Sequence, residues 1–193
     1  AFTARYIPGA ESDIPIRIYT PHGKGPFPGI IYFHGGGWSG CSIDSHENIT
    51  SHIAHAAGAV VVSVGYRLAP EHPFPAGLND AYSATTWVTE HASEMDIDPG
   101  WIAIGGDSAG ANLATVVARQ ARDRNGPRLA YQILLYPVTN LLLNTPSVEE
   151  YPQWIFLSKN DMLDIRQKYA PDPAIWQNPH ASPLLAEDLS PED

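Results

Sequence analysis

The segment Gly106-Asp107-Ser108-Ala109-Gly110 limits the possible folds of this chain most strongly, because it fits the pattern G-x-S-x-G. Residues 102–104 before it are apolar and typical of a buried strand, and residues 111–118 after it are mostly small and apolar, as in a packed helix. Glycines two positions on either side of a serine allow a tight strand-to-helix turn that lifts the hydroxyl above a sheet. The sequence therefore predicts that Ser108 is a nucleophile at the N-terminus of a helix.

Short apolar runs recur along the chain and are typical of strands buried on both faces of a sheet. These runs lie at residues 29–33, 59–64, 101–104 and 131–136. Residues 14–19 alternate apolar and polar side chains, which predicts a half-buried edge strand that opens the sheet. Helical patterns lie between the strands, at about 44–57 with capping-box spacing between Asp44 and Glu47, at about 76–93 and at 108–122. Strands that alternate with helices in this way predict an α/β fold with a mostly parallel sheet.

The composition changes after Pro137, and this change divides the chain into three predicted parts. Residues 1–137 carry the strand and helix patterns of the core. Residues 138–183 contain six prolines and a helical patch near 158–169 but no clear buried strand. We therefore expect a cap-like insertion over the carboxyl edge of the sheet, where ligands of open α/β sheets bind. Residues 184–193 are expected to return toward the core.

A second glycine-rich segment, residues 34–38 with the sequence His-Gly-Gly-Gly-Trp, follows the apolar run at 29–33. Residues without side chains let backbone N–H groups point at a developing oxyanion, so we expect an oxyanion hole built from the N–H groups of Gly36, Gly37 and Ala109. A structural glycine turn and a phosphate-binding loop are the alternatives, but no Gly-Lys-Ser/Thr ending supports the second. His34 precedes the serine, and we expect it to hold the loop rather than to act as a base.

Charge and cysteine content exclude several classes of partner. The net charge of −10 opposes binding to nucleic acid or to an anionic membrane surface, and the longest apolar stretches are strand-sized, so we expect no membrane insertion. Cys41 is the only cysteine and is expected to be a buried or half-buried thiol, which favours a reducing, cytoplasmic location. His46, His52 and His55 lack an accompanying carboxylate pattern, so we expect a helix face rather than a metal site.

Five blocks of the sequence resemble the bacterial hormone-sensitive-lipase-like (family IV) carboxylesterases. They occur in the family's order at residues 34–38, 66–76, 106–110, 136–139 and 181–185. The resemblance implies an α/β-hydrolase fold with helices on both faces of the sheet, and hydrolysis of short-chain acyl esters through an acyl-enzyme intermediate, without a cofactor. It implies that Ser108 is the nucleophile and that Asp107 is a structural member of the turn. The oxyanion hole would again be Gly36, Gly37 and Ala109.

The chain departs from this family near both ends. Almost nothing precedes Arg5, where the family carries a helical cap segment, so we expect only a partial cap. Residues 188–190 resemble the point just before the family's next core strand, and the triad acid and histidine, which follow the serine in that order, lie beyond it. The only histidine after Ser108 is His180, which we expect to be a loop residue, with a catalytic base as the alternative. The sequence thus predicts a fragment that is truncated at its C-terminal end and inactive or weak alone.

Two functional hypotheses follow. The first is a serine carboxylesterase for small-molecule esters, completed by a separate C-terminal polypeptide of the same enzyme or by another subunit that covers the open edge of the sheet. The second is a noncatalytic, receptor-like protein that binds a small ligand on the same fold, because plant gibberellin receptors resemble these esterases and lack a working triad histidine. The intact serine turn and the three-glycine loop favour the hydrolase.

Overall fold

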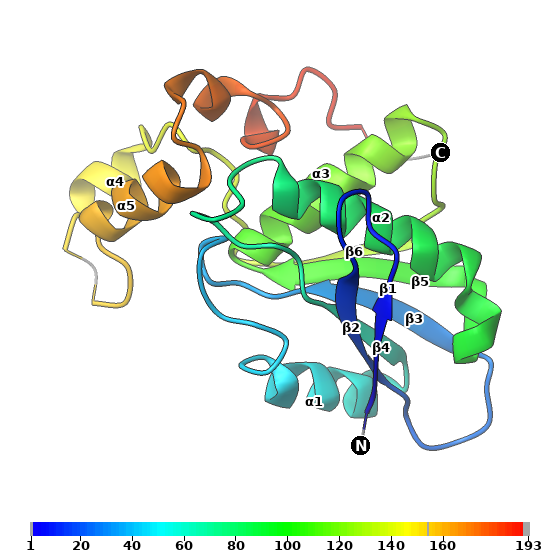
Figure 1. The fold of residues 1–193 in the computed structure, drawn as a ribbon. Helices are drawn as coiled ribbons and strands as arrows, with labels where there is room; N and C mark the ends of the chain where they lie inside the picture. Colours follow the sequence, from blue (N-terminus) through cyan, green and yellow to red (C-terminus); the bar gives the residue numbers. More distant parts are fainter. Residues whose placement is uncertain (1, 154, 191–193) are drawn as a thin grey trace.

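A computed structural model describes residues 2–153 and 155–190, and this part of the chain forms a six-stranded sheet with helices on both faces (Figure 1). The strands are Thr3–Ile7 (β1), Ile14–Tyr19 (β2), Phe27–Phe33 (β3), Val60–Val64 (β4), Ile97–Asp107 (β5) and Tyr131–Leu135 (β6). Their order in the sheet is β1-β2-β4-β3-β5-β6. The pairs β4–β3, β3–β5 and β5–β6 are parallel, whereas β1–β2 and β2–β4 are antiparallel. The predicted α/β fold with a mostly parallel sheet is confirmed.

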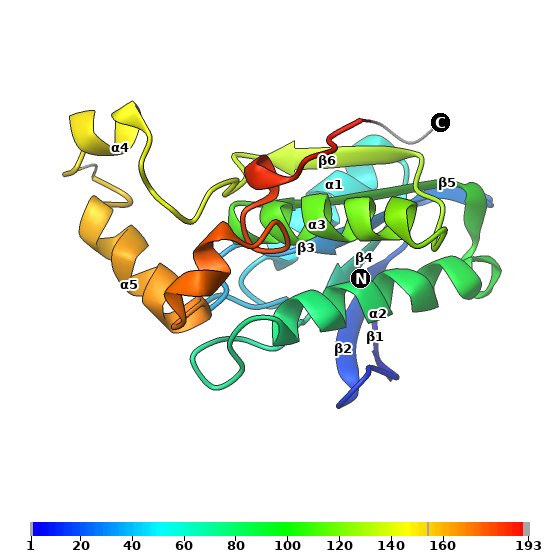
Figure 2. The same ribbon diagram turned by 90° about the horizontal axis from the view of Figure 1, so that it is seen from above.

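The helices pack on opposite faces of this sheet (Figure 2). Helix α1 (Glu47–Ala57) covers one face, while α2 (Ala76–Glu90) and α3 (Ala109–Asp123) lie together on the other, and a 3-10 turn, η1 (Ala92–Met95), links α2 to β5. Strand β4 shows why its run is apolar at almost every position: Val60, Val62 and Val64 enter the core under α2 and α3, and Val61 enters the core under α1. The sheet is therefore buried on both faces at its centre.

The ends of the sheet differ from the sequence prediction. Residues 14–19 form β2 as predicted, but they do not open the sheet, because β1 pairs with their outer side. No periodic signal pointed to β1, whose side chains are mostly exposed. Strand β6 was expected to be buried on both faces, yet all its side chains except that of Leu135 are exposed. The reason is its place in the sheet: in the described part of the chain nothing pairs with its outer side.

The start of α1 was also predicted incorrectly. The helix begins at Glu47, and its N-cap, His46, makes no capping hydrogen bond through its side chain. Asp44 and Glu47 instead both accept from the guanidinium of Arg17 on β2. A long-range ion pair thus replaces the local capping box that the spacing suggested.

After β6 the described chain forms helices and turns but no further strand. These elements are α4 (Pro146–Glu150), α5 (Lys159–Tyr169), and the 3-10 turns η2 (Pro173–Gln177) and η3 (Pro183–Leu185). The predicted helix at 158–169 is confirmed, and a capping box between Ser158 and Asp161 starts it. Helix α5 lies beyond the carboxyl ends of the parallel strands (Figure 2). The boundaries of a cap-like unit at 138–183 stay a prediction.

Candidate active site

Ser108 lies between the end of β5 and the first turn of α3, in a backbone conformation that serine rarely adopts. Its φ is 52° and its ψ is −116°. The turn is held on both sides: the N–H of Ser108 donates to the carbonyl of Leu135 over 2.9 Å, and its own carbonyl accepts from the N–H of Asn112 over 3.1 Å. Strain of this kind persists only where the surroundings over-determine it, and it is concentrated at functional sites.

The two glycines of the motif are required by the closeness of β3. A Cβ atom on Gly110 would lie 2.5 Å from the carbonyl carbon of Phe33 and 2.6 Å from the carbonyl oxygen of His34. A Cβ atom on Gly106 would lie 2.7 Å from the carbonyl carbon of Gly110. Because these neighbours are backbone atoms that cannot rotate away, only glycine lets α3 start directly against the end of β3.

The second glycine-rich segment follows β3 and forms a tight loop beside this turn. Gly36 and Gly37 have φ values of 110° and 60°, both in the left-handed region that favours glycine. The carbonyl of Gly36 accepts from the N–H groups of Ser39 and Gly40, which closes the loop. A Cβ atom on Gly37 would lie 2.7 Å from Cγ2 of Ile165 on α5, so α5 packs directly on the glycine loop.

The carboxylate of Asp107 joins the serine turn to the glycine loop. Its Oδ1 accepts from the hydroxyl of Tyr32 over 2.9 Å and from the N–H of Gly35 over 3.0 Å. The Nε2 atom of His46 lies 3.3 Å from Oδ1 and 3.4 Å from Oδ2. Burial acts to raise the pKa of Asp107, but the hydrogen bonds from His46 and Tyr32 outweigh it and hold the pKa below its ordinary value. The side chain of Asp107 is therefore an ionised acceptor whose hydrogen bonds hold the glycine loop to the serine turn.

His34 is held inside the loop rather than presented to the serine. Its Nδ1 atom donates to the carbonyl of Gly35 over 2.7 Å, and its ring stacks on that of Tyr66 with 4.5 Å between the ring centroids. The hydroxyl of Tyr66 donates to the carbonyl of His34 over 2.6 Å. Burial lowers the pKa of His34, against the opposing effect of its bond to Gly35, so the ring is neutral. These contacts agree with the prediction that His34 supports the loop.

The predicted oxyanion-hole residues follow two neighbouring strands: Gly36 and Gly37 come shortly after the end of β3, and Ala109 comes shortly after the end of β5. Ala109 is the first residue of α3, and its N–H group belongs to the first turn, which has no partner within the helix. Within the described residues, the N–H groups of Gly36, Gly37 and Ala109 make no hydrogen bond. The hydroxyl of Ser108 likewise has no hydrogen-bond partner among those residues. The partial positive charge of the helix N-terminus adds to these free donors.

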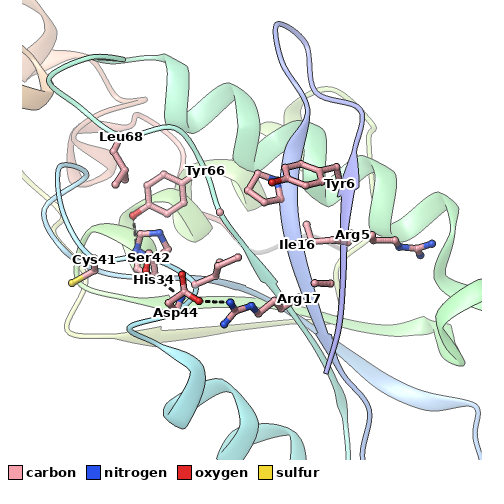
Figure 3. A pocket seen from close by; sticks show the side chains of 14 residues that line it. Arg5, Tyr6, Ile16, Arg17, His34, Cys41, Ser42, Asp44, Tyr66 and Leu68 are labelled. Atoms are coloured by element: carbon pink, nitrogen blue, oxygen red, sulfur yellow. Dashed lines mark hydrogen bonds and ion pairs between the residues drawn. The ribbon is translucent and has the colours of Figure 1, made fainter. Parts of the chain in front are cut away.

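A cavity of about 520 Å³ opens beside this site, between the β1–β2 hairpin and the loop before α1 (Figure 3). His34, Cys41, Asp44 and Tyr66 contribute to its walls. Ser108 and the three predicted donors do not line it. We therefore locate the candidate chemistry from the serine turn and the glycine loop, not from this cavity.

The remaining candidate residues lie away from the serine. The Nδ1 atom of His180 lies 3.2 Å from the amide nitrogen of Gln120, which is near the far end of α3 and about 18 Å along the helix from Ser108 at 1.5 Å per residue. His180 is therefore too far away to act as the base in this arrangement. Cys41 is exposed, so the expectation of a buried or half-buried thiol is wrong.

In residues 2–153 and 155–190, no group of three or more His, Cys, Asp or Glu side chains could hold a metal ion. Over the same ranges, no helix is long and apolar enough to cross a bilayer.

A strained serine between a buried strand and a helix, facing a glycine loop across the end of a parallel sheet, defines the architecture of the α/β hydrolases. The chain belongs to this family, since the family model described as alpha/beta hydrolase fold matches residues 30–192. It is 43% identical over 190 residues to the carboxylic ester hydrolase LipN of Mycobacterium tuberculosis, which is 95% of this chain and 50% of LipN. It is 49% identical over 154 residues to the carboxylesterase NlhH of the same species, covering 79% of this chain and 48% of NlhH.

A solved structure gives the same result. The hyperthermophilic esterase from the archaeon Pyrobaculum calidifontis superposes with a TM-score of 0.95 at 41% sequence identity, over 98% of this chain and 63% of the esterase. The resemblance to the carboxylesterases is therefore confirmed. The chain spans about half the length of the curated relatives LipN and NlhH.

Proposed function

We propose that this chain carries the nucleophile half of a serine carboxylesterase. Ser108 attacks the carbonyl carbon of a small-molecule ester with a short acyl chain, and the alcohol leaves from an acyl-enzyme intermediate that water then hydrolyses. The N–H groups of Gly36, Gly37 and Ala109 hold the oxyanion during both steps. No metal or other cofactor has a part in this sequence of steps.

The observation that carries the proposal is the conformation of Ser108. Its positive φ is held by backbone hydrogen bonds at the head of α3, and glycines allow the close contact with β3. A turn without a chemical role has no need of a serine in this conformation, because glycine adopts it without strain. The naming of the relatives as carboxylic ester hydrolases supports ester hydrolysis as the reaction class.

The base and the acid that activate Ser108 come, in this proposal, from outside these 193 residues. A separate polypeptide of the same enzyme, or another subunit, supplies them and adds to the open side of β6. The exposed side chains of that strand support this idea, since Tyr131 is 64% exposed and both Ile133 and Leu134 are more than a third exposed. Unpaired, apolar sheet edges are rarely left uncovered in a stable protein. A cytoplasmic location remains our expectation from the single cysteine.

The direct test is covalent labelling with a fluorophosphonate probe of the chain purified together with the polypeptide or subunit that accompanies it, read by intact mass and peptide mapping. We expect the probe on Ser108, and we expect Ser108→Ala to abolish labelling. Ser147→Ala, on the exposed short helix α4, is the matched control and should label as the parent does. Turnover of p-nitrophenyl acetate then tells whether the labelled serine also completes the reaction. A parent chain that never reacts at Ser108, even beside any copurifying polypeptide, would contradict the proposal.

One observation keeps a second function in view. In the described residues no histidine is hydrogen-bonded to the hydroxyl of Ser108, so none of them activates the serine to turn over a bound ligand. This receptor-like alternative predicts saturable binding of a small carboxylic acid that does not depend on an activated serine. Isothermal titration with acetate and longer fatty acids, in the parent and in Ser108→Ala, distinguishes the two functions.

A further inference from the structure

His46 makes a contact that its position in the sequence does not suggest. It stands at the N-cap of α1, where a surface role would be ordinary, yet only 14% of its side chain is exposed. The carboxylates nearest to it in sequence, Asp44 and Glu47, are both bound to Arg17. The imidazole of His46 faces instead the carboxylate of Asp107, which lies directly before Ser108.

The hydrogen bonds determine which atom of His46 carries the proton. The ionised carboxylate of Asp107 can only accept, so Nε2 must be the donor toward it. The Nδ1 atom lies 2.9 Å from the hydroxyl of Ser45, which can either donate to that nitrogen or turn its proton to the carbonyl of Ser42. Ser45 therefore does not compete for the proton on Nε2, which stays directed at Asp107.

Three donors from three different elements thus fix one carboxylate. The hydroxyl of Tyr32 comes from β3, the N–H of Gly35 from the glycine loop, and Nε2 of His46 from the start of α1. The carboxylate also packs closely on Gly35, since a Cβ atom there would lie 3.1 Å from the carboxyl carbon of Asp107. Because the N–H of Gly35 donates to Oδ1, we expect a rotation of the carboxylate to shift Gly35 and the two glycines that follow it.

We propose that His46 is a positioning residue for the glycine loop: through the carboxylate of Asp107 it holds the N–H groups of Gly36 and Gly37 where an oxyanion would form. The inference rests on the proposed function for its effect on catalysis, but not for its effect on the loop. Interactions with an oxyanion exist in the transition state and not in the bound ester, so a displaced loop lowers kcat and leaves KM nearly unchanged.

The test uses the whole chain with three substitutions. His46→Leu removes the donor at similar volume, and His46→Gln restores an N–H group near the place of Nε2. His52→Leu is the control, because His52 lies on the exposed side of the same helix and, within the described part of the chain, its ring bonds only the carbonyl of Asn48. The first readout is hydrogen exchange at the amide of Gly35, which needs no activity. The second is the kcat and KM of Ser108-dependent hydrolysis of p-nitrophenyl acetate.

We expect His46→Leu to exchange the Gly35 amide about tenfold faster than the parent and to lose at least about tenfold in kcat with little change in KM. His46→Gln should recover most of both losses, and His52→Leu should change neither. Unaltered exchange at Gly35 in His46→Leu would overturn the inference whatever the activity. So would an unaltered kcat in a parent that shows Ser108-dependent turnover. A parent without such turnover is what the proposed function expects of the chain without its base and acid, and the exchange at Gly35 then decides the role of His46.

Discussion

Replacing Gly110 by alanine tests the contact on which the whole site depends. The added Cβ would lie 2.5 Å from the carbonyl carbon of Phe33, about 0.9 Å inside the 3.4 Å at which ordinary contact begins. Alanine is favoured over glycine in a helix by at most about 1 kcal/mol, whereas overpacking against a rigid neighbour costs about 1–3 kcal/mol or more. Since the neighbour is the backbone of a central strand, we expect a cost at the upper end of that range and a net loss of about 2 kcal/mol.

A loss of that size corresponds to a fall in Tm of about 4–8 °C for a chain of this length, measured by circular dichroism and checked by urea unfolding. Gly40→Ala is the matched control, because its Cβ would meet only the carbonyl oxygen of Gly36, at 3.5 Å, and its φ is ordinary. We expect that control to stay within about 0.5 kcal/mol of the parent. If Gly110→Ala melts together with Gly40→Ala, then α3 does not start against β3 as described and the geometric argument for the site fails.

Two further predictions concern the strain and the charge at the end of β5. Ser108→Gly should be more stable than Ser108→Ala by about 1 kcal/mol. Glycine relieves backbone strain on the order of 1–3 kcal/mol, but part of that gain is lost because glycine makes the unfolded chain more flexible. Paired thermal melts test this, and a glycine variant less stable than the alanine variant would refute the strain. Asp107→Asn should cost stability at neutral pH, since the amide cannot accept from every donor that the carboxylate engages. The folded pKa of Asp107 lies below the ordinary 3.8, so the carboxylate stabilises the fold above about pH 4 and loses that contribution as the pH falls through the folded pKa. Urea midpoints of parent and variant should therefore converge in acid, and a difference that persists there would contradict the assignment.

The central strands and the long helices could be predicted from sequence because their signals are local. The apolar runs that became β3 and β4 are buried on both faces, and such burial requires apolar side chains at successive positions. The serine turn was predictable for a similar reason, since the glycines at 106 and 110 report steric limits of one short segment. The backbone geometry of the serine turn can therefore be inferred from the motif alone.

Other features depended on partners far away in the sequence and left no local signal. Strand β1 is recognisable only through its pairing with β2, because its own side chains are mostly exposed. Strand β6 has the composition of a buried strand, but its place at the edge of the described sheet decides its exposure. The spacing of Asp44 and Glu47 is typical of a capping box, but both carboxylates bind the guanidinium of Arg17 instead.

The residues of the candidate site also fall into those with a local sequence signal and those that depend on distant partners. The sequence by itself determined the fold class, Ser108 as the candidate nucleophile and the glycine loop that faces it, because each follows from backbone constraints within a few residues. Only the tertiary structure decided that Asp107 joins the two segments, that His46 reaches this carboxylate from the start of α1, and that His180 lies far along α3 from the serine. Those facts are set by the packing of strands and helices against one another, and side chains brought together by packing share no pattern that a linear sequence records.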